Sequence, residues 1–280
     1  MKLRNKFFPI TCLDIVSFVF ISLIVPFGYC FEILLVLPTF YSATSFWFIL
    51  HAFSGSFVLV NIVSNFVFIM ITDTSVKKNL ESQTHGSQHW NFCRKCDIRI
   101  PPRSWHCNVC NCCVLKRDHH CQFTGCCIGH HNHRYFFFFV FYMALGTIYA
   151  LYLHTRYIYR TATEYVETGL QFRGSRILAF ALGLSYSIQN CYLLFYGVTL
   201  FGVGVSMFFF LFHFTTMTRG QVLYERARDI NAYDSGSVKK NIEQVLGKRW
   251  YLAWISPFVT SELPSDGVKW AQHKFNKRVI

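Results

Sequence analysis

Residues 93–136 read CRKCDIRIPPRSWHCNVCNCCVLKRDHHCQFTGCCIGHHNHRYF and hold nine of the twelve cysteines in the chain. Histidines are interleaved with these thiols, most densely around the run DHHC at 118–121. Two Cys-x2-Cys pairs, one beginning at Cys93 and one at Cys107, have the tight spacing that lets two thiolates reach one tetrahedral ion. The segment therefore predicts reactive thiols in a fold that bound metal stabilises.

The segment also contains more metal donors than these two pairs. The further donors are His106, Cys112, Cys113, His119, His120, Cys126, Cys127, His130, His131 and His133. The supply suffices for two closed four-ligand sites, but spacing alone does not assign each donor to an ion. The alternative, that most of these thiols are small buried hydrophobes, fits poorly because the segment has little apolar core.

Hydrophobic stretches flank the cysteine-rich segment on both sides. A mean hydropathy of +0.29 and 19% aromatic residues place the 280-residue chain among integral membrane proteins. A helix needs about twenty apolar residues to cross about 30 Å of hydrocarbon. We predict four such helices, at Ile15–Leu37, Trp47–Ile71, Tyr135–Thr155 and Ser187–Phe212.

The first span carries the weakest signal. Pro26 and Glu32 lie inside it, and we expect Glu32 near the membrane interface. The basic residues that precede it, in MKLRNKFF at 1–8, resemble the start of a signal peptide. The apolar run is long, however, and lacks a clear small-residue cleavage site, which favours an uncleaved helix.

Lysine and arginine gather on one side of the predicted membrane. Nine lie between residues 77 and 134 and eleven follow residue 218, whereas the linker 38–46 has none. The positive-inside rule therefore places both termini and the cysteine-rich segment in the cytosol. A reducing cytosol disfavours a disulfide framework and so supports metal binding. The net charge of +13 suits a lipid bilayer with anionic headgroups or a phosphate-bearing cosubstrate, and the membrane spans argue against nucleic acid.

The predicted fold is an all-α polytopic membrane protein with four transmembrane helices and a cytosolic zinc-binding insert between helices 2 and 3. The parts are an N-terminal tail with helices 1 and 2 (1–72), the cysteine-rich domain (73–134), helices 3 and 4 (135–218) and a cytosolic tail (219–280). In the tail, Ser237 as N-cap, apolar residues at helical spacing and Gly247 as a stop predict a short amphipathic helix.

The cysteine-rich segment resembles the corresponding domain of the DHHC protein S-acyltransferases (palmitoyltransferases). The order of that pattern is complete: CxxC, a nine-residue gap, HCxxC, a Cys five before Asp118, a Cys six after Cys121, then Asn132 and Phe136. Looser matches follow outside it. Asp73 stands where the family has Asp-Pro-Gly, the run TTMT at 215–218 resembles the TTxE motif, and the segment 233–247 resembles the C-terminal motif through Tyr233 and Asn241.

This resemblance implies two structural zinc ions. One would be held by Cys93, Cys96, His106 and Cys113. The other would be held by Cys107, Cys110, His120 and Cys127. Cys112 and Cys126 receive no role from the family, and we interpret them as surplus thiols.

The resemblance also implies the chemistry. Cys121 would be the nucleophile, His119 its general base and Asp118 the group that orients the base. Such a division is sound, because the thiolate is the reactive form of cysteine and a carboxylate fixes the tautomer of its histidine. By similarity, palmitoyl-CoA or a similar fatty acyl-CoA is the donor, cysteines of membrane-associated proteins are the acceptors, and the Golgi or the endoplasmic reticulum is the host membrane.

In the family, the four helices form a cavity for the acyl tail. Residues 136–139 are all Phe and would line or cover it here, although lipid-facing packing is the commoner role for such aromatics. Basic residues of the insert are candidate phosphate contacts, but solvated surface charge is the commoner role for each. These residues are Arg94, Lys95, Arg99, Lys116, Arg117 and Arg134.

Three departures from the family pattern leave the rate and the acyl chain-length preference open. Gln122-Phe123 replaces Pro-Trp, Gly125-Cys126 replaces an Asn pair, and Thr218 replaces Glu.

Two other functions remain as alternatives. An inactive zinc-stabilised membrane scaffold would show no autoacylation. A transporter or channel would need polar groups deep in the spans, and the few present more commonly bond neighbouring helices. They are His51, Asn61, Asn65, Asn190 and a few hydroxyls.

Overall fold

The structure is a computed structural model that describes residues 4, 9, 11–77, 90–167 and 188–270, with side chains except at 161–167 and 188–191. The chain forms two compact units. Unit 1 contains Met1–Leu23, Asn61–Phe139 and Leu211–Ile280, and unit 2 contains Ile24–Val60 and Val140–Phe210. The domain boundaries at residues 73, 135 and 219 stay a prediction.

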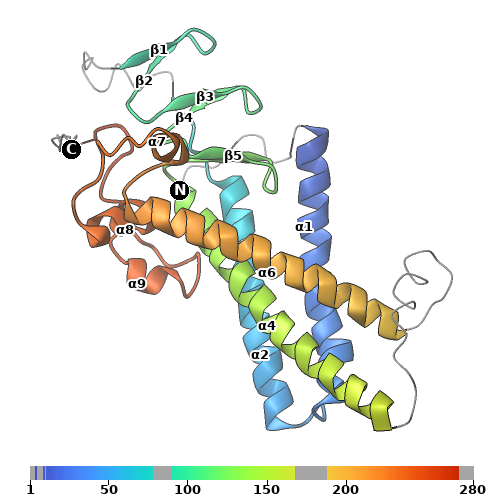
Figure 1. Ribbon diagram of the computed structural model, residues 1–280. Helices are drawn as coiled ribbons and strands as arrows, with labels where there is room; N and C mark the ends of the chain where they lie inside the picture. The colour runs from blue at the N-terminus through green and yellow to red at the C-terminus, as the bar shows by residue number, and fades with distance from the viewer. Residues whose placement is uncertain (1–3, 5–8, 10, 78–89, 168–187, 271–280) are drawn as a thin grey trace, which may run out of the picture. The chain divides into compact units, whose positions relative to one another are not determined.

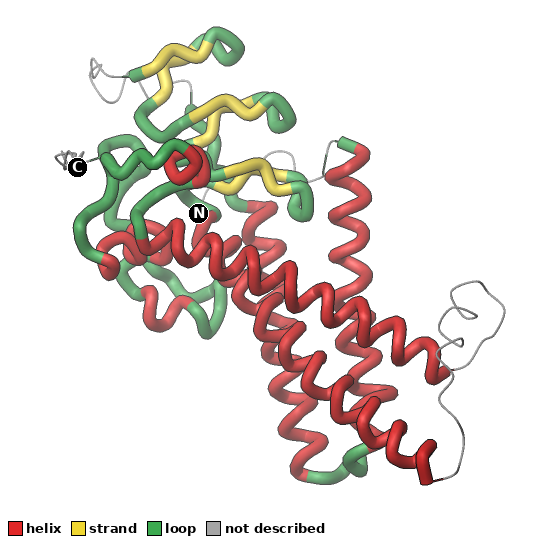
Figure 2. The backbone as a smooth tube through the Cα atoms, viewed as in Figure 1, coloured by secondary structure: helices red, strands yellow, loops and turns green. Residues whose placement is uncertain are grey.

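Four helices, drawn red in Figure 2, have the length and composition of membrane spans. They are α1 (Cys12–Phe31), α2 (Phe46–Ile71), α4 (His133–Glu167) and α6 (Ile188–Thr218). A π-helical turn and a 3₁₀ turn extend α1 to Thr39. The four predicted helices are confirmed within the described residues, and Ser187, the predicted start of the last, lies outside them.

In unit 2, aromatic rings and one ion pair join the helices. Phe31 stacks on Phe195 with ring centroids 4.5 Å apart. Glu32, at the start of the π-helical turn, lies with Oε1 2.8 Å from His154 Nε2 on α4. An ionisable residue inside a span is costly unless it is paired, so His154 explains why this helix accommodates Glu32.

The cysteine-rich insert forms three antiparallel hairpins of three-residue strands, which lie one after another in Figure 1. They pair β1 (Asn91–Cys93) with β2 (Ile98–Ile100), β3 (Trp105–Cys107) with β4 (Cys112–Val114), and β5 (His119–Cys121) with β6 (Cys126–Ile128). These strands were not predicted from the sequence. Each hairpin turn contains a left-handed residue, namely Asp97, Asn111 or Gly125, and these residue types tolerate that conformation best.

Backbone and amide hydrogen bonds tie the hairpins to the helix ends. Asn132, which is buried, accepts a bond from Gly129 N (2.8 Å) and donates to Cys127 O (3.0 Å) and to Ile69 O in the last turn of α2 (3.3 Å). Leu115 N donates to Thr74 O at 2.9 Å. These bonds hold β6 and the end of β4 close to the end of α2 and the start of α4.

Three short helices follow α6 in the part of the tail that the structure describes: α7 (Leu223–Ala227), α8 (Val238–Leu246) and α9 (Trp250–Ala253). The predicted tail helix is confirmed as α8, and it stops at Gly247, whose φ of +82° favours glycine. Ser237 is the N-cap residue, as predicted, although its side chain makes no capping hydrogen bond. Buried Asn241 instead fixes α8 by donating to Thr218 O at 2.9 Å.

Candidate active site and metal centres

Two groups of metal donors lie in the insert, and each group joins two neighbouring hairpins. The first is Cys93, Cys96, His106 and Cys113, and the second is Cys107, Cys110, His120 and Cys127. Within each group the donor atoms lie within 4.8 Å of one another. The structure thus brings together the same two sets that the family resemblance implied.

The distances inside both groups fit zinc. From His106 Nδ1, the sulfurs of Cys93, Cys96 and Cys113 lie at 3.7, 3.2 and 3.9 Å. From His120 Nδ1, the sulfurs of Cys107, Cys110 and Cys127 lie at 3.7, 3.4 and 3.8 Å. A tetrahedral ion with Zn–S of about 2.3 Å and Zn–N of about 2.1 Å separates S and N by about 3.6 Å. No disulfide joins the described cysteines, so their thiols are available to a metal.

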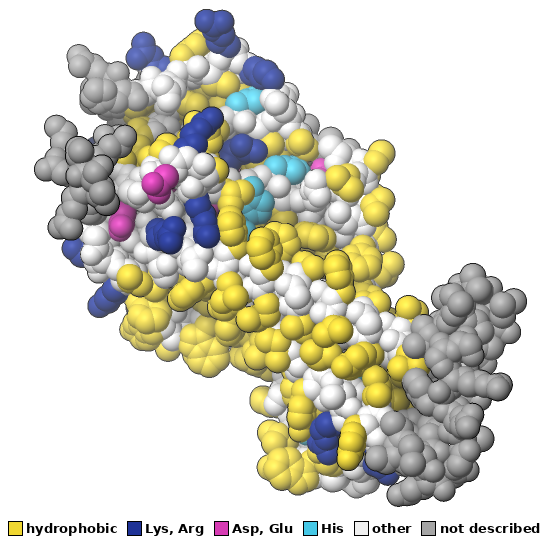
Figure 3. Space-filling model, viewed as in Figure 1, with side chains coloured by type: hydrophobic (Ala, Val, Ile, Leu, Met, Phe, Trp, Pro, Cys, Tyr) yellow, Lys and Arg dark blue, Asp and Glu magenta, His cyan; other side chains and the backbone are white. Residues whose placement is uncertain are grey.

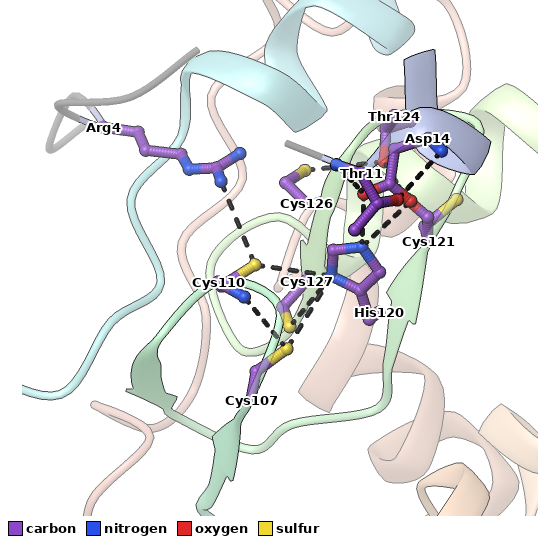
Figure 4. A network of polar contacts seen from close by, with 10 residues as sticks. All are labelled: Arg4, Thr11, Asp14, Cys107, Cys110, His120, Cys121, Thr124, Cys126 and Cys127. Atoms are coloured by element: carbon purple, nitrogen blue, oxygen red, sulfur yellow. Dashed lines mark hydrogen bonds and ion pairs between the residues drawn. The ribbon is translucent and has the colours of Figure 1, made fainter. Parts of the chain in front are cut away.

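Asp14, from another part of the chain, contacts the histidine of the second donor group. His120 Nε2 lies 3.3 Å from Asp14 Oδ1, as the close view in Figure 4 shows. Asp14 is buried in the first turn of α1. A carboxylate behind a ligating histidine fixes its ring and raises its basicity. Asp14 was not predicted from the sequence, although an isolated acid at the start of the first span was a usable signal.

Cys121 stands apart from both donor groups. Side chains alternate along a strand, so Cys121 and His119 face away from the side on which His120 meets the sulfurs. In Figure 4 the Cys121 sulfur points away from those of Cys107, Cys110 and Cys127. Cys121 is buried, with 5% of its surface exposed, and belongs to no donor group found among the described residues.

His119 connects this thiol to a buried carboxylate. Its Nδ1 donates to Asp118 Oδ2 at 2.7 Å, and Asp118 Oδ1 accepts a second bond from Leu223 N at 2.9 Å. Burial alone would raise the pKa of Asp118. The hydrogen bond from His119 and the nearby His133 outweigh it and hold that pKa well below its usual range.

The thiol and the histidine shift each other's protonation. Burial would raise the pKa of Cys121, but its hydrogen bond with His119 brings that pKa below the ordinary value. Burial would lower the pKa of His119, but hydrogen bonds to Asp118 and Cys121 raise it to about 9. The contact between Cys121 and His119 therefore shifts the pair toward a thiolate beside an imidazolium, which is the arrangement of an activated nucleophile.

Aromatic residues from α4 and α6 close this site within unit 1. The Phe136 ring makes edge contacts with His119 and with His213, each at 4.9 Å between centroids. His213 Nδ1 lies 3.8 Å from Asp118 Oδ2, a neighbour that sequence reasoning missed. All four phenylalanines at 136–139 are buried in protein, with 4–6% exposed, so the expected lipid-facing packing was wrong.

Thr218, which stands where the family motif has Glu, supplies no carboxylate, and a different acidic residue supports this segment. The Thr218 hydroxyl bonds only locally, to Thr215 O at 3.0 Å. Glu225 instead accepts two hydrogen bonds from Arg103, from Nε at 2.7 Å and from Nη2 at 2.6 Å. Its Oε2 also accepts a bond from Val222 N at 2.8 Å, so Glu225 fixes the start of α7 beside Asp118.

The basic residues of the insert differ in exposure, and two of them, Arg117 and Arg134, are half-buried. Arg94, Lys95 and Arg99 are exposed, and Figure 3 shows Lys and Arg side chains gathered around the hairpins. Lys116 differs, since only 2% of it is exposed and its Nζ donates to Gln244 O at 3.1 Å. Lys116 is therefore neither a solvated surface charge nor a phosphate contact.

Fold and site together define a class: a multi-pass membrane protein whose metal-compatible hairpins hold a buried thiol beside a His–Asp pair at the helix ends. A family model described as DHHC palmitoyltransferase matches residues 86–230. The chain is 31% identical to a Mus musculus protein named "Probable palmitoyltransferase ZDHHC24", over 76% of this chain and 75% of that one. The Homo sapiens protein of that name is also 31% identical, over the same shares.

A shorter match runs to the Mus musculus "Palmitoyltransferase ZDHHC16", which is 46% identical over 28% of this chain and 21% of that protein. The chain belongs to the DHHC palmitoyltransferase family. Its enzymatic activity is that of a protein S-palmitoyltransferase.

Proposed function

We propose that this chain carries a fatty acyl group from acyl-CoA to cysteine thiols of membrane-associated proteins through an acyl-Cys121 intermediate. The arrangement that supports the proposal is Cys121 outside both donor groups, with His119 between its thiol and buried Asp118. Zinc bound to the two donor groups would serve as scaffold, fixing the hairpins that carry these residues.

The reaction takes two steps. The Cys121 thiolate attacks the thioester carbonyl of palmitoyl-CoA or a similar donor, the C–S bond to CoA breaks, and His119 gives its proton to the departing CoA thiolate. An acceptor cysteine then loses its proton to His119 and attacks the acyl-Cys121 thioester, which restores the Cys121 thiolate. Asp118 keeps the His119 ring in one tautomer and orientation throughout.

The membrane setting follows from the helices on either side of the insert. β6 is tied to the end of α2 through Asn132, and α4 begins at His133, only a few residues later. This arrangement suits a donor whose acyl tail lies in the bilayer and whose nucleotide lies in water. We propose a cytosolic insert and cytosolic termini on the charge asymmetry, and a Golgi or endoplasmic reticulum membrane on the family's commonest location.

Autoacylation of the purified protein tests the proposal directly. With a labelled fatty acyl-CoA, the wild type should acquire hydroxylamine-sensitive label, and Cys121→Ser should acquire none while keeping near two zinc ions. Cys126→Ser, which removes the neighbouring unassigned thiol, should still label. Persistent thioester label on Cys121→Ser would refute the assignment, and an unlabelled wild type with intact zinc would favour the scaffold alternative.

A further inference from the structure

A C-terminal strap, residues 261–270, lies against both the short helices and the cysteine-rich insert. Ser261 Oγ donates to Leu246 O at 2.8 Å, at the end of α8. Four residues later, Ser265 O lies 3.0 Å from His130 Nε2, just after β6. The strap therefore connects the tail to the segment that carries the proposed nucleophile, all within unit 1.

A built turn anchors the strap next to the hairpins. The Asp266 carboxylate accepts hydrogen bonds from Val268 N at 2.9 Å and from Lys269 N at 3.1 Å. Gly267 has a φ of +81°, and a Cβ there would lie 2.6 Å from the His130 ring, so only glycine fits. Val268 is 5% exposed and packs in a hydrophobic cluster with Ile98, Ile100, Leu115 and neighbouring residues of the first hairpins.

The strap places the Trp270 indole against the buried guanidinium of Arg103. The guanidinium carbon of Arg103 lies 4.6 Å from the centroid of the Trp270 ring and 4.6 Å from that of Tyr233. The Arg103 side chain is fully buried. A guanidinium packed on aromatic faces away from water is held in both position and orientation.

Arg103 connects this aromatic pair to the carboxylate of Asp118 through a series of contacts. It donates two hydrogen bonds to Glu225, which in turn accepts the amide of Val222. The next amide, of Leu223, donates to Asp118 Oδ1 at 2.9 Å. The contacts therefore run without a gap from Trp270 through Arg103, Glu225 and the start of α7 to Asp118.

We propose that Trp270 is a positioning residue for acyl transfer, which acts through Arg103 and Glu225 on the orientation of Asp118 and hence of His119. The kinetic part of this inference rests on the proposed function of Cys121. Loss of the indole lets the Arg103 guanidinium turn, which loosens Glu225 and the Leu223 amide. The nucleophile, the base and the eight zinc ligands stay in place. The rate of acylation therefore falls, while the binding of acyl-CoA does not change.

Single-turnover autoacylation of the zinc-loaded full chain, well below its melting temperature, separates positioning from folding. Trp270→Ala should lower the maximal rate at least fivefold, at an unchanged half-saturating acyl-CoA concentration and with zinc near two. Trp270→Phe, which keeps an aromatic face over Arg103, should stay within twofold of wild type. Trp254→Ala is the matched control, because Trp254 is 47% exposed and its indole donates to the nearby Tyr251 O, and it should not change the rate.

A double-mutant cycle tests the route through Arg103. Arg103→Lys keeps the charge but loses the two-pronged contact with Glu225. Adding Trp270→Ala to Arg103→Lys should cost less than twofold more, since both changes interrupt one chain of contacts. The proposal would be overturned if the rate losses of Arg103→Lys and Trp270→Ala multiply in the double variant. A Trp270→Phe variant as slow as Trp270→Ala would also overturn it.

Hydrogen exchange distinguishes failure of this inference from failure of the proposed function. The Leu223 amide should exchange at least fivefold faster in Trp270→Ala than in wild type, and at the wild-type rate in Trp254→Ala, whether or not the protein autoacylates. Faster exchange in a protein that never labels would reject the enzyme mechanism and keep the positioning contact. Unchanged exchange in an active enzyme would reject the positioning contact alone.

Discussion

The buried pair Arg103–Glu225 allows a stability prediction with a defined size. Its two hydrogen bonds measure 2.6 and 2.7 Å, and the side chains are 0% and 2% exposed. Glu225→Gln keeps the shape of the residue but leaves the Arg103 charge buried without its counter-ion. Removing one partner of a buried ion pair costs about 3–5 kcal/mol.

Thermal unfolding of the zinc-loaded protein in detergent measures this cost. At about 2–4 °C per kcal/mol for chains of roughly this size, Glu225→Gln should lower the melting temperature by on the order of 10 °C. Glu262→Gln provides the matched control, because the Lys248–Glu262 pair is 3.7 Å apart with side chains 65% and 85% exposed. An exposed pair of this kind contributes about 0–1 kcal/mol.

Two results would refute this reasoning. One is a Glu225→Gln protein that melts within about 2 °C of Glu262→Gln, since about 1 kcal/mol or less would then separate a buried pair from an exposed one. The other is an Arg103→Met/Glu225→Leu double variant that melts no higher than Glu225→Gln. Replacing both charges removes the uncompensated ion, so most of the lost stability should return.

Three further predictions concern metal, pH and the catalytic carboxylate. Cys113→Ser should lose one of two zinc ions by elemental analysis while its neighbour variant Cys112→Ser keeps both, and equal zinc contents would contradict the ligand assignment. Burial and Arg103 lower the pKa of Lys116 to about 7, against an ordinary 10.5. Between these two pH values the unfolded state binds a proton that the folded state does not, so the free energy of unfolding increases as pH rises. Lys116→Met should flatten that rise in melts from pH 7.5 to 9.5 and exposed Lys95→Met should not; parallel curves would be evidence against the buried-lysine interpretation. Asp118→Asn should slow autoacylation by about 10²-fold with zinc near two, given that general-base catalysis supplies about 10²–10⁴, whereas Asp97→Asn in an exposed turn should match wild type.

Local sequence patterns predicted most of the fold, and the family resemblance supplied both donor sets. The spans followed from long charge-free runs, and the spacing of Cys93, Cys96, Cys107 and Cys110 predicted metal binding without assigning each donor to an ion. The strands escaped prediction because three residues are too few to show an alternating pattern. Hydropathy likewise does not distinguish a phenylalanine that faces lipid from one buried in protein, as at 136–139.

The partners of the site escaped prediction because tertiary contacts alone bring them there. Glu225 reaches Arg103 across 122 residues of chain, and Asp14 reaches His120 across 106. The same cause explains Lys116, whose charge predicts solvent exposure until Trp270 and Gln244 cover it. Sequence spacing identifies ligands that share a turn. Only the folded chain shows which distant carboxylate contacts a residue of the site.

The hairpin of β5 and β6 assigns adjacent histidines to different tasks. A shift of one residue in the pairing of a strand moves every side chain to the opposite face, so it would exchange His119 with His120. Zinc held by His120 and the sulfurs of Cys107, Cys110 and Cys127 would hold that pairing in place. Zinc depletion, or oxidation of Cys127 alone, would then misplace the reacting side chains without altering any of them, and activity would depend on metal supply as well as on Cys121.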